Sequence, residues 1–292
     1  MKIIDSHIHL WKIQNGKHNS KPVYSVGNGK SMFGGEVRQM MPPYMLSGEN
    51  TAEMLISNMD YARVSGGVCV QEIMDGNQDD YLLSVKKTYS DRIKICSLYE
   101  ENDNFAVDGF DGIKLCSCKF KEQNLLKHIN VFEKAAKHGK FIAIDMADGD
   151  AQTGQLEEII RSYPDLKIAI GHFGMVTRKN WEQQIKLARY KNVYIESGGI
   201  TWLFNSEFYP FPSAVKAILT AAEICGFEKL MWGSDYPRTM TEITYKMSYD
   251  FIVKSNDLNT REKELFLYEN AKSFYGFTDL PDCPVIKNML ED

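Results

Sequence analysis

Two histidines near the start of the chain form the first pattern with chemical meaning. His7 and His9 flank Ile8 within the largely apolar segment 2–10. In a β-strand, residues i and i+2 point to the same face, so both imidazoles project together while Ile8 faces the other way. Neutral imidazole is the commonest metal ligand, and the pair therefore predicts a metal clamp. With six histidines in the chain, this spacing arises by chance in roughly one sequence in ten, so other residues must support it.

A carboxylate and a third histidine each end another apolar segment. Asp235 follows LMWGS, and His172 follows IAIG with a further glycine, Gly174, two residues later. A carboxylate beside the histidine pair would bind a metal or accept a proton, whereas the structural alternative for Asp235 is a helix N-cap before Thr239. The glycines around His172 leave room for a close approach to its ring. The alternative for His172 is a structural histidine bonded to a neighbouring strand.

Eight apolar, β-branched segments alternate with amphipathic helical patterns and predict parallel βα units. The expected strands cover residues 2–10, 67–73, 93–99, 111–116, 141–146, 167–172, 192–197 and 229–235. The fold class is therefore α/β, a single-domain (β/α)₈ TIM barrel spanning 1–292, and 292 residues is an ordinary length for this fold. Closure places the eighth strand beside the first, so Asp235 should meet His7 and His9 at the carboxyl-terminal face where these folds hold their active sites.

Three segments depart from the regular βα repeat. Residues 100–110 are too few for a full crossover helix, which predicts a degenerate third helix. Residues 11–50 carry Gly, Pro, Asn and Ser with little periodicity, and long loops in compact domains are usually functional. We therefore expect a lid loop there, the alternative being a floppy surface loop. A last helix, 260–275, should pack outside the barrel.

The composition limits the classes of partner. Hydrophobic residues make up 43% of the chain and charged residues 25%, as in globular proteins. The net charge of −5, without a basic run, argues against nucleic acid but not against a small acidic ligand. No apolar run is long enough to span a membrane, and the first residues are too polar for a signal peptide. The six scattered cysteines predict buried thiols in a reducing cytoplasm rather than disulfides or a structural zinc site.

The ordered motifs resemble those of a known superfamily. HIH on the first strand, GHFG around His172, GSDYP around Asp235 and the late Glu269-Asn270-Ala271 are similar to the amidohydrolase superfamily. The resemblance covers essentially the whole chain. It is narrowest to the amidohydrolase-related branch, which contains sugar lactonases, pyrone-dicarboxylate lactonases and aminocarboxymuconate-semialdehyde-type decarboxylases.

This resemblance implies a divalent metal, usually zinc, although some lactonases of the branch work without one. It implies His7 and His9 as metal ligands, Asp235 as a ligand or general base, and His172 as a catalytic hydrogen-bonding group. One position departs from the family, because the fifth strand commonly ends in a metal-binding histidine and here carries Asp145. A carboxylate also binds zinc, so the site either keeps the metal with an altered charge, binds it more weakly, or prefers manganese.

Further residues at strand ends are candidates for substrate binding. Lys114 stands where dinuclear relatives carry a carbamylated lysine, but DGIKL looks like the mononuclear branch, which leaves a substrate contact or a structural ion pair. Gln71, Glu72 and Glu196 also end strands and either line the pocket or support residues that do. Arg38 in the predicted lid, Lys114 and Arg238 are candidates to anchor a carboxylate or hydroxyl of a small-molecule substrate.

These residues favour a metal-dependent hydrolase that opens a lactone or related cyclic ester of a small organic or sugar acid. A divalent metal would supply hydroxide at neutral pH, Asp235 would transfer the proton, and His172 or the metal would stabilise the oxyanion. The first rival is a metal-dependent, non-oxidative decarboxylase of an aromatic or dienoic acid, which the departure at Asp145 weakens. A non-catalytic binding protein is the second rival. No residue favours a peptidase or deaminase. A homodimer is also expected, since barrels of this kind often dimerise.

Overall fold

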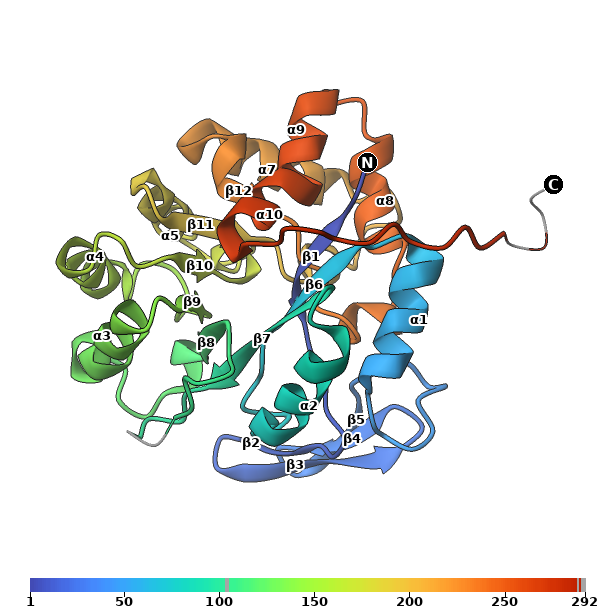
Figure 1. Cartoon of the computed structure of the whole chain (residues 1–292), viewed down its shortest axis with the longest axis horizontal. Helices are drawn as coiled ribbons and strands as arrows, with labels where there is room; N and C mark the ends of the chain where they lie inside the picture. The colour runs from blue at the N-terminus through green and yellow to red at the C-terminus, as the bar shows by residue number, and fades with distance from the viewer. Residues whose placement is uncertain (103–104, 288, 290–292) are drawn as a thin grey trace.

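Eight short parallel strands form the centre of the molecule in the computed structural model, which describes residues 1–102, 105–287 and 289. Figure 1 shows these strands surrounded by helices. Their order in the sheet is β1-β6-β7-β8-β9-β10-β11-β12. The bounds are β1 (Ile4–Ile8), β6 (Gly66–Cys69), β7 (Ile93–Leu98), β8 (Gly112–Leu115), β9 (Phe141–Ile144), β10 (Ile168–Ile170), β11 (Val193–Glu196) and β12 (Leu230–Met231). The predicted (β/α)₈ barrel is confirmed.

Backbone hydrogen bonds between the first and last strand regions close the barrel. The Ser6 amide donates to the Trp232 carbonyl over 2.9 Å, and the Asp235 amide donates to the His7 carbonyl over 2.9 Å. A further parallel bridge joins Ile8 to Tyr236. Residues separated by more than 220 positions therefore share one edge of the barrel, as closure of eight strands requires.

Helices cover the outside of the barrel and present their apolar faces to it. In α1, for example, Leu55, Met59 and Ala62 are buried at the helical spacing that the sequence shows. The main helices are α1 (Ala52–Ala62), α2 (Asp79–Tyr89), α3 (Ile129–Lys137), α4 (Thr153–Ser162), α5 (Glu182–Ile185), α7 (Pro212–Cys225) and α8 (Met247–Lys254). At the end of the chain, α9 (Thr260–Glu264) and α10 (Asn270–Tyr275) are joined by a π-helical turn, Leu265–Glu269.

The connection between β7 and β8 contains no helix in residues 99–102 and 105–111, the part that the structure describes. The sequence predicts a degenerate helix at this place. Instead, buried Phe105, Val107 and Phe110 cover this side of the barrel from an irregular segment. Three aromatic and aliphatic side chains thus replace the apolar face that a helix would supply.

The segment predicted as a lid loop, 11–50, contains a four-stranded antiparallel sheet, which corrects the expectation of a loop throughout. Its strands are β2 (Asn15–His18), β3 (Lys21–Gly27), β4 (Lys30–Phe33) and β5 (Glu36–Gln39). Figure 1 shows this sheet beside the end of β1. Val23 and Ser31 are fully buried on its inner side, whereas every residue of β5 is exposed. Because the strands are short and mostly polar, alternating hydrophobicity does not reveal them.

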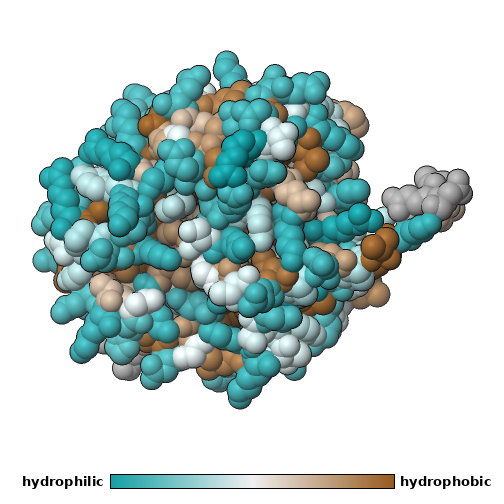
Figure 2. Space-filling model, turned by 45° about the horizontal axis from the view of Figure 1, so that its top comes forward, coloured by the Kyte–Doolittle hydropathy of each residue, from teal (hydrophilic) through white to brown (hydrophobic). Residues whose placement is uncertain are grey.

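Figure 2 shows a largely hydrophilic face on which apolar areas are small and separated. All six cysteines are free, but the prediction of buried thiols holds only for Cys69, Cys96 and Cys116. Cys118 is exposed, and Cys225 and Cys283 are partly exposed. Among the residues that the structure describes, no helix combines the length and apolarity needed to cross a bilayer.

Asp5 stabilises the closure of the barrel from beneath its carboxyl-terminal face. Its carboxylate accepts hydrogen bonds from the Ser234 amide (2.8 Å), the Ser234 hydroxyl, the Tyr245 hydroxyl (2.8 Å) and the His7 amide (3.0 Å). The Asp5 side chain is fully buried, so each of these donors would lose its partner without meeting water if the carboxylate were removed.

We therefore expect Asp5→Ala to lower the free energy of unfolding by about 2 to 4 kcal/mol, because several buried donors become unsatisfied. Urea unfolding followed by circular dichroism measures the change. Asp257→Ala, at an exposed position, is the matched control and should alter stability by less than about 0.5 kcal/mol. Equal free energies of unfolding for the two variants would show that Asp5 does not stabilise the closed barrel.

Candidate active site

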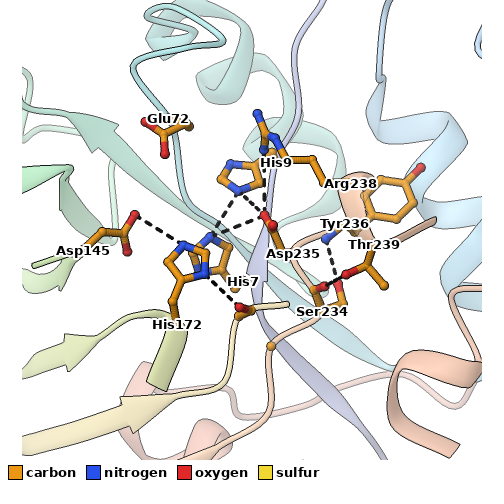
Figure 3. Close-up of polar contacts among 12 residues, drawn as sticks. His7, His9, Glu72, Asp145, His172, Ser234, Asp235, Tyr236, Arg238 and Thr239 are labelled. Carbon is orange, nitrogen blue, oxygen red and sulfur yellow. Dashed lines mark hydrogen bonds and ion pairs between the residues drawn. The ribbon is translucent and has the colours of Figure 1, made fainter. Parts of the chain in front are cut away.

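Three donor atoms from the two ends of the chain converge at the carboxyl-terminal face of the barrel. His7 Nε2 lies 3.1 Å from His9 Nε2, and His9 Nε2 lies 2.9 Å from Asp235 Oδ1. His7 Nε2 is 3.9 Å from the same oxygen. Figure 3 shows the two imidazoles and the carboxylate turned toward one another. All three side chains are buried.

This arrangement fits a divalent metal. Ligand atoms around a tetrahedral zinc, with bonds of about 2.0 to 2.2 Å, lie about 3.4 Å from one another. The three separations of 2.9, 3.1 and 3.9 Å bracket that value. Two imidazole nitrogens that face each other can share at most one proton, so a cation between them satisfies both lone pairs. His7, His9 and Asp235 are therefore the residues that would hold a metal here.

Glu196 contacts the candidate metal ligands, His7, His9 and Asp235, through the ring of His7. Its Oε1 lies 2.7 Å from His7 Nδ1, and its Oε2 accepts a hydrogen bond from the Gly198 amide over 2.6 Å. Burial opposes ionisation of Glu196, but the contact with His7 outweighs burial and holds the pKa of the carboxyl below its usual value. A carboxylate on Nδ1 fixes the imidazole with its Nε2 lone pair directed at the metal position. Glu196 does not itself line the cavity.

Trp202 positions the Asp235 carboxylate and was not identified from the sequence. Its indole Nε1–H donates to Asp235 Oδ2 over 2.8 Å from the short helix α6 (Ile200–Leu203). Burial disfavours charge on Asp235, but the His9 contact and the nearby Arg238 hold its pKa well below the usual range. Asp235 is thus ionised, with one oxygen toward the histidines and the other on Trp202. A lone tryptophan just after a strand end was the only sequence signal.

His172 lies beside the candidate metal ligands, with its ring 4.6 Å from the ring of His7. Its Nδ1–H donates to the Gly198 carbonyl over 2.8 Å, which leaves Nε2 3.6 Å from Asp145 Oδ2. Burial alone would lower the pKa of His172, but the facing Asp145 carboxylate raises it to about 9. The ring therefore carries a proton on Nε2 at neutral pH and can donate it toward the cavity. The backbone φ of 55° at His172 and 60° at Asp235 is uncommon for residues other than glycine and occurs often at functional sites.

Asp145 forms an ion pair with Lys114. Lys114 Nζ lies 2.6 Å from Asp145 Oδ1, and both side chains are buried. Lys114 sits behind the cavity wall and does not line the cavity, so the structural ion pair is the alternative that the structure shows for it. Asp145 Oδ2 remains directed at the cavity, where it forms a second candidate metal group with His7 and His172.

The cavity at this face has a volume of about 470 Å³. Its lining combines the polar residues His9, Asp145, His172 and Asp235 with Trp202 and Gln39. Four methionines add apolar surface: Met40, Met74, Met146 and Met175. A larger hollow of about 800 Å³ lies near the opposite ends of β8, β9 and β10. That hollow contains none of the converging residues, so the smaller cavity is the candidate active site.

Besides Lys114 and Glu196, Arg38 and Gln71 are predicted substrate-binding residues that do not line this cavity, which corrects those expectations. Arg38 lies on the exposed strand β5 and pairs with Glu36, with its guanidinium 5.0 Å from the ring centroid of Phe33. Gln71 donates to Asp79 over 2.6 Å and to the Cys96 carbonyl over 2.8 Å, so its amide is occupied beneath the surface. Whether Arg38 and Gln71 reach the cavity depends on the direction of their side chains, which position in a strand alone does not determine.

Arg238, Glu72 and Lys119 do line the cavity. Arg238 Nη2 lies 2.6 Å from Asp75 Oδ2, and Lys119 Nζ lies 2.9 Å from Glu72 Oε1. Burial opposes ionisation of Glu72, but Lys119 lowers its pKa to about 2. Lys119 was not identified from the sequence, because it lies in a single 3₁₀ turn after β8, Ser117–Lys119, which is too short to show a pattern of its own.

Replacing Glu196 by glutamine tests whether this carboxylate prepares His7 for a metal. We expect Glu196→Gln to weaken zinc binding about 10- to 100-fold, because His7 loses the charged partner that orients its ring. Competition with a chromophoric chelator measures the affinity. Glu157→Gln, at a surface carboxylate that contacts Arg161 and Arg189, should leave the affinity unchanged. Equal affinity in both variants would contradict the role assigned to Glu196.

Comparisons with known proteins find the same fold in solved structures. A protein assigned as 2-pyrone-4,6-dicarboxylic acid hydrolase from Acinetobacter baumannii, with citric acid bound, is 19% identical, with a TM-score of 0.67 over 95% of this chain and 100% of that chain. An amidohydrolase from Burkholderia multivorans with bound zinc is 13% identical, with a TM-score of 0.68 over 96% and 100%. The 5-carboxyvanillate decarboxylase of Novosphingobium aromaticivorans, complexed with manganese, is 15% identical, with a TM-score of 0.55 over 76% and 79%.

These structural likenesses, at under 20% identity, show the fold. No curated protein matches the chain. The family model described as Amidohydrolase matches residues 4–277, which includes every strand of the barrel and the residues His7, His9, His172 and Asp235. The chain is therefore an enzyme of the amidohydrolase family.

Proposed function

We propose that the enzyme hydrolyses a lactone or related cyclic ester of a small organic or sugar acid, using a divalent metal, zinc or manganese, held by His7, His9 and Asp235. The observation that carries the proposal is the placement of the Asp235 carboxylate beside the His7 and His9 imidazoles, with the His172 ring 4.6 Å from that of His7. Family membership and the resemblance of the fold to a pyrone-dicarboxylic acid hydrolase support it.

Asp235 is the proton carrier of the proposed reaction. A bound divalent metal supplies Lewis acidity, which favours ionisation of water and polarises a carbonyl. Asp235 accepts the proton of the attacking water and returns it to the ring oxygen that leaves as the ester bond breaks. The Trp202 indole holds one oxygen of Asp235 in place throughout, so the carboxylate does not need to reorient.

His172 stabilises the charge that develops on the carbonyl oxygen. Its Nε2–H points into the cavity, while Nδ1–H is fixed on the Gly198 carbonyl. A cationic donor fixed before the reaction stabilises an oxyanion more strongly than water does, because no reorganisation is needed as charge appears. Glu196 contributes by holding His7, and Lys114 by balancing the Asp145 carboxylate beneath the reacting atoms.

A decarboxylase is the second candidate, favoured by the resemblance of the fold to the 5-carboxyvanillate enzyme with manganese. Its substrate must present a carboxylate to the site, next to the ionised Asp145 and Asp235. Release of carbon dioxide from aromatic acids, with no acid produced from lactones, would establish this activity in place of hydrolysis.

Asp235→Asn separates proton transfer from metal binding. We expect kcat to fall about 10²- to 10⁴-fold in protein assayed at saturating zinc, because the amide cannot accept the proton. A pH-indicator assay on a lactone panel measures kcat, and metal analysis of the same sample measures the zinc content. Asp257→Asn is the control. Unchanged turnover in Asp235→Asn would remove this residue from the mechanism.

A further inference from the structure

A second, smaller cavity adjoins the candidate active site. It has a volume of about 230 Å³ and shares three lining residues with the 470 Å³ cavity: Trp202, Asn205 and Glu242. The connections that follow β11 and β12 form it, and such connections commonly set specificity in barrels of this kind. We call it the side cavity. Neither the candidate metal ligands nor His172 line it, so a group that enters it lies beyond the reacting atoms.

Apolar side chains make up much of the lining of the side cavity. Ile243 packs against the main hydrophobic core, and both Ile243 and Met247 are half-buried. A bound apolar group would cover the part of these side chains that still meets water, and such burial is favourable in proportion to its area. The apolar and aromatic residues of the lining include Trp202, Phe208, Phe211, Ile243 and Met247.

The side cavity offers little to a charged group. The Thr239 hydroxyl already donates to the Ser234 carbonyl over 2.6 Å, and the Glu207 carboxylate already accepts from the Ser213 amide over 3.0 Å. Among the lining residues, all of which the structure describes, there is no lysine, arginine or histidine. A carboxylate placed there would lose water without gaining a cation, whereas an apolar group has nothing to lose.

Trp202 is the wall that the two cavities share. Its indole N–H is held on Asp235 Oδ2 at 2.8 Å, and its ring centroid lies 6.0 Å from that of His172. The same side chain therefore borders the reacting centre and lines the side cavity, in a position fixed before any ligand binds. A substituent on a ring bound beside Asp235 reaches the side cavity by passing along Trp202.

We propose that the side cavity binds an uncharged apolar substituent, about the size of a butyl or phenyl group, carried by the lactone that the enzyme hydrolyses. The inference rests on the proposed lactone hydrolysis and adds a feature of its substrate. An apolar cavity of about 150 Å³ holds a benzene molecule. The 230 Å³ of the side cavity is therefore sufficient for such a group.

Two lactones that differ only in this substituent test the inference by turnover. γ-Octalactone carries a butyl group on the ring of γ-butyrolactone. We expect its kcat/KM to be at least about tenfold higher, because each buried methylene contributes about three- to fourfold. A pH-indicator assay of the zinc-loaded protein measures both values. Equal kcat/KM for the two lactones would overturn the inference and leave lactone hydrolysis in place.

Matched variants locate the source of the preference. Ile243→Asn should reduce the ratio of the two kcat/KM values about 5- to 30-fold, because the butyl group would then bury an amide. The same change at an exposed isoleucine near the end of the chain, Ile286→Asn, should leave the ratio as in the wild type. If Ile243→Asn does not fold, Met247→Gln takes its place. A folded variant at either lining position that kept the full ratio would contradict the assignment.

Binding of lactams separates the inference from the proposed function. The compounds 2-pyrrolidinone and 5-butyl-2-pyrrolidinone have the same ring with a stable amide, so calorimetry reports binding without turnover. The butyl compound should bind at least about tenfold more tightly, and Ile243→Asn should remove most of this gain. If no lactone is hydrolysed but the lactam pattern holds, the proposed function fails and the side cavity stands. Equal binding of the two lactams would overturn the inference whatever the enzyme hydrolyses.

Discussion

The parallel closure of β1 onto the segment after β12 is the constraint on which the site depends. The Asp235 amide bonds to the His7 carbonyl, and the His9 amide bonds to the Tyr236 carbonyl, so backbone hydrogen bonds set the distance between imidazoles and carboxylate. Asp5 strengthens the same joint from below through Ser234 and Tyr245. The position of the candidate metal ligands therefore follows from the fold itself, and a barrel that failed to close would have no such group.

Because the charged side chains around the candidate site are largely buried, nearly every one of them requires a partner of opposite charge. Asp145 is balanced by Lys114, Glu72 by Lys119 and Asp75 by Arg238, each pair at 2.6 to 2.9 Å. Isolated charges are very costly in such surroundings, whereas paired ones are tolerated. These pairs keep the carboxylates ionised.

The barrel and the meeting of His7, His9 and Asp235 could be predicted because they depend on repeated features. Strand count, apolar periodicity and closure together imply which strand ends are neighbours. The sheet between residues 15 and 39 was missed, since its short polar strands lack a periodic apolar pattern. Arg38 was placed wrongly for the same reason: the strand β5 turns its side chain to solvent. Trp202 lies in the short helix α6 and Lys119 in a single 3₁₀ turn, Ser117–Lys119. Both elements are too short to show a sequence pattern, so only the final backbone path decides what these side chains reach.

The Asp145 position shows a different limit. The sequence indicated a carboxylate where the family commonly has histidine, but it left open whether that carboxylate binds metal. Lys114 comes from the neighbouring strand and takes one of its oxygens, a pairing that depends on the register of β8 against β9. Register is fixed by the packing of both strands in the barrel and is not visible in either segment alone.

A crystal structure of zinc-loaded protein, with data collected on both sides of the zinc absorption edge, tests the central claim most directly. The account predicts one anomalous peak bonded to His7 Nε2, His9 Nε2 and Asp235 Oδ1. A peak held elsewhere, for instance by Glu72, Cys116 and Asp145 without the histidines, would contradict it.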